Sequence, residues 1–418
     1  MIIKRDIFDK IIEVLDSKKI IILRWPRQVW KTTLMKDIQR FLGDKKTIFL
    51  NMDDLDIKSK ISTPKDLINY VKYEFWYYEW EEITIFLDEF QNIENAWVFL
   101  KNIYDSYQNI SLICSGSSSL EITKNSEFLT GRKILFDITW FTFNEYLKTK
   151  NFKSLDFRFT LDNFDDIIWF YNLYSNELEN YLEEYLTIWW YPEIVLTSWN
   201  LRQQIAKDII ETYIKKDITS FLKVENITAF NNLIKIFSSQ VWNLVNKSEI
   251  NSTLWISINT LFKYIEILKG TFIIHIVNPY FSNIRKELSK MPKIYFNDLW
   301  LRNYLLYWNL KNIQSQDIGQ LAENFIYNEL KEKNNIWINF YRTISKSEID
   351  FIFQKTYDEI IPIEVKYRNK VNIPESIKNF KENYSDKVKE SIIFTKSTLD
   401  KKDDVYMIPS CLIWFIEL

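Results

Sequence analysis

The stretch IIILRWPRQVWKTTLMKDIQRFL, residues 20–42, decides the fold of this chain. It joins an apolar run, a short loop and a Lys-Thr-Thr sequence at 31–33 that opens an amphipathic helix. A phosphate-binding loop has the pattern G-x-x-x-x-G-K-[ST], in which backbone N–H groups at a helix N-terminus surround phosphate oxygens. The spacing here predicts such a loop, although Trp25 and Trp30 stand at the two glycine positions.

Each part of this loop has a separate expected role. The lysine reaches the β- and γ-phosphates of ATP, the first hydroxyl holds Mg²⁺, and the loop backbone follows the phosphate chain. An indole at a glycine position would fill the phosphate space and resist the backbone angles that glycine supplies. The residues expected to contact ATP are Trp25, Pro26, Arg27, Gln28, Val29, Trp30, Lys31, Thr32 and Thr33.

The glycine and tryptophan contents are abnormal in opposite directions. The chain has 5 Gly and 16 Trp among 418 residues, whereas glycine averages about 7% in proteins. Trp255, Trp300 and the pair at 189–190 lie in turn contexts where glycine is expected. We hypothesise that many of these tryptophans are glycines whose UGA codons were translated with the wrong genetic code. The alternative is a degenerate pseudo-ATPase with genuine tryptophans.

Composition bounds the class of protein. A chain of 418 residues suggests about three domains, and 47% hydrophobic with 26% charged residues is typical of a folded globular protein. The net charge of −2 excludes a global basic field for nucleic acid but leaves room for a local basic patch.

Cysteine usage and hydropathy indicate a cytoplasmic, soluble protein. Cys114 and Cys411 lie in apolar runs far apart, which favours two reduced structural thiols. His275 lies within FIIHIV and is expected to be packed rather than to bind a metal. The charged N-terminus differs from a signal peptide, and no apolar run approaches the roughly 18 residues of a membrane helix.

Short apolar strands alternate with helical segments up to about residue 150, which predicts an α/β domain with a parallel sheet. The expected strands are Ile20 to Leu23, Thr47 to Leu50, Ile83 to Leu87, Ile110 to Ser115 and Lys133 to Ile138.

The third strand ends in Asp88 and Glu89. Its apolar run would place Asp88 beside the Mg²⁺ held by Thr32, and Glu89 where it can polarise the attacking water. Two acids at the end of a strand are common, but their position after a Lys-Thr loop in the same sheet makes the assignment specific.

The strand at 110–115 and the segment LTGRK after it each offer a polar side chain that could contact the phosphates of ATP. Ser115 ends that strand beside the expected γ-phosphate, and Arg132 in LTGRK could stabilise developing phosphate charge. A solvated surface arginine is the alternative for Arg132.

The middle of the chain holds no catalytic constellation. Residues 151–225 are expected to form a helical lid or connector. In 226–290, two short helices at 247–254 and 257–268 precede an apolar strand at 272–277, which is a winged-helix pattern. The alternative to a DNA-binding module is a packing module between catalytic domains. The second helix would present outward Ser257, Asn259, Thr260 and Lys263.

The remaining residues, from 291 to the end, return to an α/β pattern. A helix carries Glu323, the strand EIDFIF carries Asp350, and the strand IPIEVKYR carries Glu364 and Lys366. Because residues two apart share one face of a strand, Glu364 and Lys366 point the same way. Asp350 and Glu364 could bind a divalent metal, with Glu323 as a supporting acid and Lys366 beside the nucleophilic water. Solvated salt-bridge residues are the alternative.

With glycine in place of both loop tryptophans, the loop resembles GPRQVGKTTL, and the chain resembles a family of prokaryotic AAA-type ATPases with a C-terminal nuclease-like domain. The resemblance extends over nearly the whole chain. It implies a P-loop ATPase domain, a winged helix and a restriction-endonuclease-like domain of the PD-(D/E)xK type. Its stretches here are RWPRQVWKTTL, IFLDEFQNI, LTGRK, FTFNEYL, WWYPEIV, KIYFNDLWLRNYLL, GQLAENFIYNEL, EIDFIF and IPIEVKYR. The functional positions it implies are Lys31, Thr32, Asp88, Glu89, Glu323, Asp350, Glu364 and Lys366.

The sequence as a whole predicts a Mg²⁺-dependent ATPase whose nucleotide state controls a C-terminal nuclease-like module. The alternative is a nucleotide-regulated module that binds DNA or a partner protein and has no C-terminal chemistry. Both allow a homo-oligomer, and neither involves a membrane. The expected domains are an ATPase domain at 1–150, a helical connector at 151–225, a winged helix at 226–290 and a nuclease-like domain at 291–418.

Overall fold

The chain divides into two compact units in the computed structural model. Unit 1 comprises 1–140, 191–214 and 270–272, and unit 2 comprises 141–190, 215–269 and 273–418. The phosphate-loop positions 25–30, the side chain of Lys31 and the pair at 189–190 lie outside the described residues. The structure describes residues 3–24, 31–116, 126–187, 201, 204–205, 207–208, 224–241, 244–280, 291–307, 315–334, 337–343 and 347–418.

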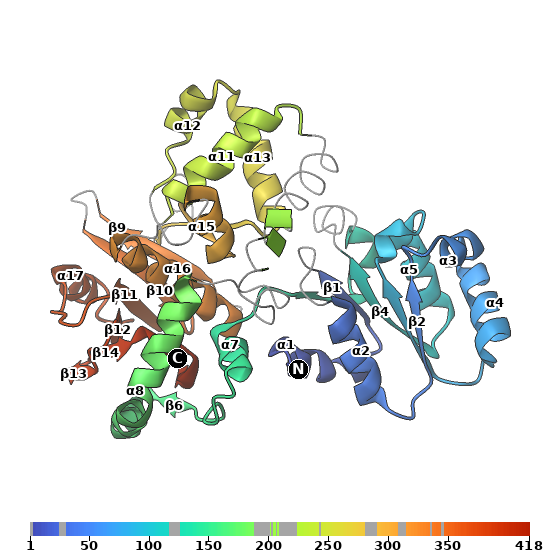
Figure 1. Cartoon of the computed structure of the whole chain (residues 1–418), viewed down its shortest axis with the longest axis horizontal. Helices are drawn as coiled ribbons and strands as arrows, with labels where there is room; N and C mark the ends of the chain where they lie inside the picture. Colours follow the sequence, from blue (N-terminus) through green and yellow to red (C-terminus); the bar gives the residue numbers. More distant parts are fainter. Residues whose placement is uncertain are drawn as a thin grey trace. The chain divides into compact units, whose positions relative to one another are not determined.

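Unit 1 contains a five-stranded sheet in the order β2-β3-β4-β1-β5, and every pair of neighbours runs parallel (Figure 1). The predicted α/β class with a parallel sheet is confirmed for this unit, and each expected strand forms within one residue of its predicted ends. The strands are β1 (Ile20–Arg24), β2 (Thr47–Asn51), β3 (Ile83–Asp88), β4 (Ile110–Gly116) and β5 (Lys133–Asp137).

Helices bury an apolar stripe against this sheet. On α4, Leu67, Ile68 and Val71 belong to one hydrophobic core with alternate strand residues such as Ile85. This core leaves the opposite strand face to other apolar groups, as expected for a parallel sheet covered on both sides. The helices of unit 1 are α1 (Ile7–Ile12), α2 (Lys31–Leu42), α3 (Leu55–Lys60), α4 (Pro64–Phe75) and α5 (Ala96–Ser106), with 3₁₀ turns at Leu15–Ser17, Phe90–Asn92 and Ser126–Leu129.

Unit 2 contains a six-stranded mixed sheet in the order β13-β14-β12-β11-β10-β9. Strands β9, β10 and β11 pair antiparallel, whereas β11, β12 and β14 pair parallel. Both strands predicted to carry acids form here, and the helix predicted to carry Glu323 is α16. The elements are α16 (Ser315–Asn334), β9 (Ile338–Arg342), β10 (Glu348–Gln354), β11 (Ile360–Lys366), α17 (Glu375–Asn383), β12 (Ser391–Thr395), β13 (Asp400–Lys402), β14 (Val405–Pro409) and β15 (Ile416–Glu417).

Most of the middle of the chain, residues 141–190 and 215–269, also belongs to unit 2. The two short helices predicted before an apolar strand form as α12 and α13, and the strand forms as β7. Strand β7 pairs antiparallel with β8, so this hairpin spans the expected domain boundary at 290/291. The elements are α7 (Phe143–Thr149), β6 (Phe159–Thr160), α8 (Phe164–Thr187), α11 (Ile227–Ser239), α12 (Lys247–Leu254), α13 (Ile258–Gly270), β7 (Ile274–Val277), β8 (Lys293–Phe296) and α15 (Leu299–Tyr307), with 3₁₀ turns at Leu161–Asn163 and Ser410–Phe415.

Among the described residues, Trp76 and Trp255 have a backbone conformation that favours glycine. Trp76 ends α4 with φ +54°, and Trp255 ends α12 with φ +53° and a side chain that is 92% exposed. Glycine is the usual residue at such a left-handed helix end. Trp300 differs, because it lies one residue inside α15 and is only 1% exposed. The structure therefore gives no indication of a turn glycine at Trp300.

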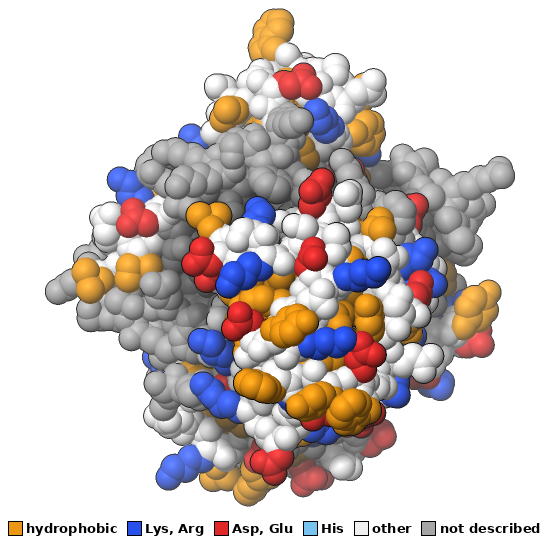
Figure 2. Space-filling model, turned by 90° about the vertical axis from the view of Figure 1, so that its right-hand side faces the viewer, with side chains coloured by type: hydrophobic (Ala, Val, Ile, Leu, Met, Phe, Trp, Pro, Cys, Tyr) orange, Lys and Arg blue, Asp and Glu red, His pale blue; other side chains and the backbone are white. Residues whose placement is uncertain are grey.

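The two cysteines and the histidine lie where the sequence predicts, within packed parts of the described structure. Cys114 and Cys411 are buried and free, and His275 packs against Tyr327 and Lys331. On the face in Figure 2, Lys and Arg side chains are interspersed with acidic and hydrophobic ones, so neither sign of charge dominates. Within the described residues, no helix combines the length and the hydropathy needed to cross a membrane.

Candidate functional site

Three strand ends converge beside the start of α2. Strand β4 lies between β1 and β3, so the carboxyl ends of all three are neighbours. Thr32 Oγ1 donates a hydrogen bond to Asp88 Oδ2 at 2.8 Å, and the hydroxyl of Ser115 donates to Asp88 Oδ1. Asp88 is 5% exposed and Ser115 is fully buried. The structure thus joins three residues that the sequence places on separate elements.

Glu89 extends this cluster through its backbone. Its N–H donates to Ser115 Oγ at 3.1 Å, and Gln91 Nε2 donates to Glu89 Oε2 at 2.6 Å. Glu89 has φ +53°, which is rare for a residue with a side chain and costs about 1–3 kcal/mol. Such strain is typical of functional positions, and here it turns the chain directly after β3.

The donor set of this cluster suits a magnesium nucleotide. Hydroxyl and carboxylate oxygens are the protein ligands that Mg²⁺ prefers, and Thr32 and Asp88 present one of each within hydrogen-bond distance. The helix N-terminus at residue 31 adds partial positive charge for a phosphate.

Arg132 lies away from this cluster. Its carbonyl accepts a hydrogen bond from the Ile20 N–H at 2.9 Å, which places it at the amino end of β1. Its guanidinium binds both carboxylate oxygens of Asp105, at 2.7 and 3.3 Å. Because Thr32 and Asp88 lie at the carboxyl ends of the strands, the predicted contact of Arg132 with phosphate is not formed within this unit.

Sequence reasoning missed a different arginine. Arg24 ends β1 directly before the loop, and its Nη2 forms a 2.6 Å ion pair with Oδ1 of Asp137 at the end of β5. This pair lies at the same sheet edge as the phosphate loop. An arginine at the last strand position, immediately before the loop, was the signal available in the sequence.

A second cluster forms in unit 2, where β10 and β11 meet. The register pairs Phe351 with Ile363, which sets Asp350 beside Glu364. The Asp350 N–H donates to Glu364 Oε2 at 3.3 Å, and the Val365 N–H donates to Asp350 Oδ2 at 2.8 Å. Lys366 Nζ donates to Glu364 Oε1. Asp350, Glu364 and Lys366 are therefore brought together as predicted from the strand pattern.

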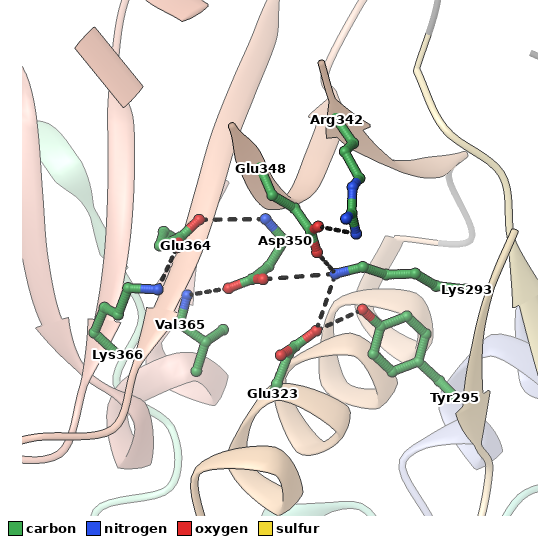
Figure 3. A network of polar contacts seen from close by, with 9 residues as sticks. All are labelled: Lys293, Tyr295, Glu323, Arg342, Glu348, Asp350, Glu364, Val365 and Lys366. Carbon is green, nitrogen blue, oxygen red and sulfur yellow. Dashed lines mark hydrogen bonds and ion pairs between the residues drawn. The ribbon is translucent and has the colours of Figure 1, made fainter. Parts of the chain in front are cut away.

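Lys293 of β8 enters the same cluster from outside the expected motif (Figure 3). Its ammonium group lies 2.6 Å from Glu348 Oε1, 3.5 Å from Glu323 Oε1 and 3.7 Å from Asp350 Oδ1. Tyr295, also on β8, donates its hydroxyl to Glu323 Oε1 at 2.7 Å. Sequence reasoning missed Lys293, Tyr295 and Glu348. Only the alternation of Lys293 and Tyr295 along one strand face could have indicated that they point together.

Burial and the crowding of like charges raise the pKa values of two acids in this cluster. Burial, followed by the charge of Asp350, raises the pKa of Glu364 to about 8 and that of Glu323 to about 7. Burial opposes the charge of Lys293, but the surrounding carboxylates outweigh it and raise its pKa above the ordinary value. The cluster therefore needs positive charge to keep its carboxylates ionised.

An open cleft of about 590 Å³ gives access to the acids. Asp350, Glu364 and Lys366 line it from the sheet, and Glu375 and Asn379 line it from α17. Across the described parts of the chain, no three His, Cys, Asp or Glu side chains already converge as a metal-ligand set. The ammonium groups of Lys293 and Lys366 instead pair with Asp350 and Glu364, respectively, and offset their charge.

The outward-facing side of α13, the expected DNA-reading helix, carries little charge. Ser257 and Thr260 bond to each other through their hydroxyl groups at 2.8 Å. Lys263 is half exposed and forms a 3.3 Å ion pair with Glu225. Asn259 is exposed on the same helix.

Three family models match separate parts of the chain. Residues 17–147 match an AAA domain, 179–312 match the domain of unknown function DUF8612, and 318–413 match the domain of unknown function DUF4143. The AAA match and the Thr32–Asp88–Ser115 contacts support an ATP-binding domain of the AAA ATPase type in unit 1.

Two similar proteins are each described as an uncharacterized protein. A protein of Methanocaldococcus jannaschii is 27% identical over 79% of this chain and 74% of its own length. One of Haemophilus influenzae is 21% identical over 98% of both chains.

Two solved structures resemble the chain only weakly. The Walker-type ATPase PABY2304 of Pyrococcus abyssi has a TM-score of 0.44 at 15% identity, covering 73% of this chain and 96% of its own. A RuvB mutant of Thermotoga maritima has a TM-score of 0.31 at 14% identity, covering 69% and 96%. Likenesses below a TM-score of 0.5 carry no conclusion about this chain.

Proposed function

We propose that unit 1 hydrolyses ATP with Mg²⁺. The observation that carries this proposal is the bonded cluster of Thr32, Asp88 and Ser115 at adjacent strand ends. Thr32 and Asp88 hold Mg²⁺, and the ion offsets phosphate charge when bound. Lys31 neutralises the β- and γ-phosphates, and Glu89 orients the attacking water. Arg132 has no part in this mechanism.

The test uses the chain carrying both Trp25→Gly and Trp30→Gly, so that the loop can surround phosphate. We expect this double variant to bind and hydrolyse ATP. Adding Lys31→Ala should abolish nucleotide binding, and adding Glu89→Gln should keep binding but lower turnover about 100-fold or more, because the water loses its orienting carboxylate. Binding by fluorescence titration and phosphate release measure the two steps. Normal hydrolysis by the Glu89→Gln variant removes Glu89 from the mechanism.

A second candidate function belongs to unit 2, which we propose binds a divalent metal and acts on phosphodiesters under control of the nucleotide state. It rests on Asp350, Glu364 and Lys366 lining one cleft. Asp350 and Glu364 hold the metal, Glu323 supports them, and Lys366 stabilises hydroxide or developing phosphate charge. The substrate class is DNA, and α13 is the candidate contact.

Metal binding and cleavage are measured together on wild type and Asp350→Ala. Calorimetry with Mn²⁺ should show binding that Asp350→Ala weakens at least 10-fold, because one of two carboxylate ligands is lost. Nicking of supercoiled and branched DNA is followed with and without ATP. Metal binding without cleavage indicates a docking module that binds DNA or a partner protein. Unchanged metal affinity in Asp350→Ala contradicts the site.

A further inference from the structure

A pocket of about 330 Å³ lies at the amino-terminal edge of the unit 1 sheet. Ile21, Thr84 and Ser111 line it, each at the start of one of the strands β1, β3 and β4. Because these strands run parallel, their amino ends share one edge of the sheet, opposite the edge of Thr32 and Asp88. The proposed ATP site therefore makes no use of this pocket.

Four lysines line the pocket, and they come from two turns of the chain. Lys18 and Lys19 lie between the 3₁₀ turn and β1, and Lys45 and Lys46 lie between α2 and β2. The Thr84 N–H donates to the carbonyl oxygen of Lys46 at 3.0 Å, which fixes the second turn to the edge of the sheet. Lys18 has φ +55°, a conformation that lysine rarely adopts, and the chain turns there into β1.

Two of these lysines already have acidic partners. Lys46 Nζ donates to Glu81 Oε2 at 2.7 Å. Lys45 Nζ lies 3.9 Å from Asp16 Oδ1, and the side chain of Asp16 is 96% exposed. An ion pair as open to water as the second one contributes little, so Lys45 keeps most of its attraction for another anion.

The other two lysines are unpaired. Among the described residues, the exposed ammonium groups of Lys18 and Lys19 form no ion pair. Glu82 is the acid of the lining that has no cationic partner in the described chain. Two unpaired positive charges against one negative charge make the pocket attractive to an anion, and most of all to one with several charges.

Uncharged polar groups complete the lining. Thr84 and Ser111 supply hydroxyl groups, and Gln108 and Asn109 supply amides. Hydroxyl and amide groups donate hydrogen bonds to phosphate oxygens, and lysine binds phosphate as a point charge. The volume is at the lower end of the range of about 300–1,000 Å³ for small-molecule sites. It favours a small phosphorylated ligand over an extended strand of nucleic acid.

We propose that this pocket binds a small phosphorylated anion at a site separate from that of ATP. Lys18 and Lys19 supply the unpaired charge, the hydroxyl and amide groups of the lining orient the phosphates, and Glu82 limits the affinity. No tryptophan lines the pocket, so the site is the same whether or not tryptophans elsewhere are mistranslated glycines.

The test uses the full chain with Lys31→Ala, which removes phosphate binding at the loop, and inorganic tripolyphosphate without divalent metal. Calorimetry at about 0.15 M salt, which screens distant charges, should show one tripolyphosphate per chain. Adding Lys18→Ala and Lys19→Ala should weaken binding at least 10-fold, because both unpaired charges are lost. Adding Lys58→Ala and Lys60→Ala instead is the matched control, since it removes two exposed lysines of α3 outside the pocket and should leave binding unchanged.

Two further variants cover the case in which the alanine substitutions disturb folding. Glu82→Gln removes the unpaired acid, so the affinity for tripolyphosphate should rise about 3-fold, a gain that misfolding does not produce. Lys18→Arg with Lys19→Arg keeps both charges and should bind as the Lys31→Ala parent does.

Three results would overturn the proposal. The first is no binding of tripolyphosphate by the Lys31→Ala parent. The second is equal affinity in that parent and in the variant that also carries Lys18→Ala and Lys19→Ala. The third is binding of a single-stranded DNA oligonucleotide in place of tripolyphosphate, which would assign these lysines to nucleic acid. None of these results bears on the proposed ATPase, which is measured separately with the glycine-containing loop.

Discussion

At the scale of single residues, the backbone distinguishes tryptophans that the sequence treats alike. Trp255 and Trp76 end helices in the left-handed region. A Cβ atom in that region crowds the following carbonyl oxygen, and a largely exposed indole gains little packing in return. Trp300 and Trp97 are buried instead. Among the described tryptophans, the hypothesis of mistranslated glycine therefore has conformational support at Trp76 and Trp255 and none at the buried Trp97 and Trp300.

Trp255→Gly is expected to raise the free energy of unfolding by about 1 kcal/mol, because glycine relieves the left-handed strain at the end of α12. Urea unfolding measures the change. Trp80→Gly is the control, since Trp80 is 76% exposed and is not among the residues with positive φ. Trp80→Gly should not raise the free energy of unfolding. Mass spectrometry of the native protein across residues 25–31 tests the hypothesis directly, and Trp at both loop positions contradicts it.

At the scale of elements, the start of α15 depends on one buried acid. Asp298 Oδ1 accepts the backbone N–H groups of Trp300 at 2.8 Å and Leu301 at 3.2 Å, so it caps the helix. Asp298 is 1% exposed, and burial raises its pKa to about 7. The helix end thus gains two hydrogen bonds but buries a carboxylate that folding pushes toward its protonated form.

Asp298→Asn should stabilise the protein above pH 7. The folded state binds a proton on Asp298 more tightly than the unfolded chain, whose pKa is about 4, so this residue lowers stability as pH rises from about 4 to about 7. Asparagine keeps the accepting oxygen without the charge. The urea midpoint of the variant should exceed that of wild type more at pH 8 than at pH 5. Asp156→Asn is the control, because Asp156 is exposed. A difference in urea midpoint between Asp298→Asn and wild type that is equal at pH 5 and pH 8 contradicts the raised pKa of Asp298.

At the scale of the whole molecule, the two larger sheets of the described residues have different chemistry. The parallel sheet of unit 1 gathers Thr32, Asp88 and Ser115 because β4 separates β1 from β3. The mixed sheet of unit 2 gathers its acids where antiparallel β10 and β11 meet and where β8 contributes Lys293. The hairpin of β7 and β8 means that the expected winged-helix and nuclease-like segments share an element.

The sequence by itself determined the features that depend on local periodicity. Strand alternation and turn chemistry located the five strands of unit 1, α12, α13 and the strands β10 and β11. They also placed Asp88 and Ser115 at strand ends, and Glu364 with Lys366 on one face. These predictions needed only the period of two in a strand, the period of 3.6 in a helix, and the shared edge of parallel strands.

Only the tertiary structure decided which distant residues share a site. Lys293 reaches Asp350 through the position of β8, and Arg132 turns to Asp105 at the opposite sheet edge from the phosphate loop. The left-handed turn at Glu89 also has no signal in its residue type, since glutamate ordinarily avoids that conformation. The physical reason is common to all three. Ion pairs and backbone strain depend on packing between elements far apart in sequence, and local pattern carries no information about those distances.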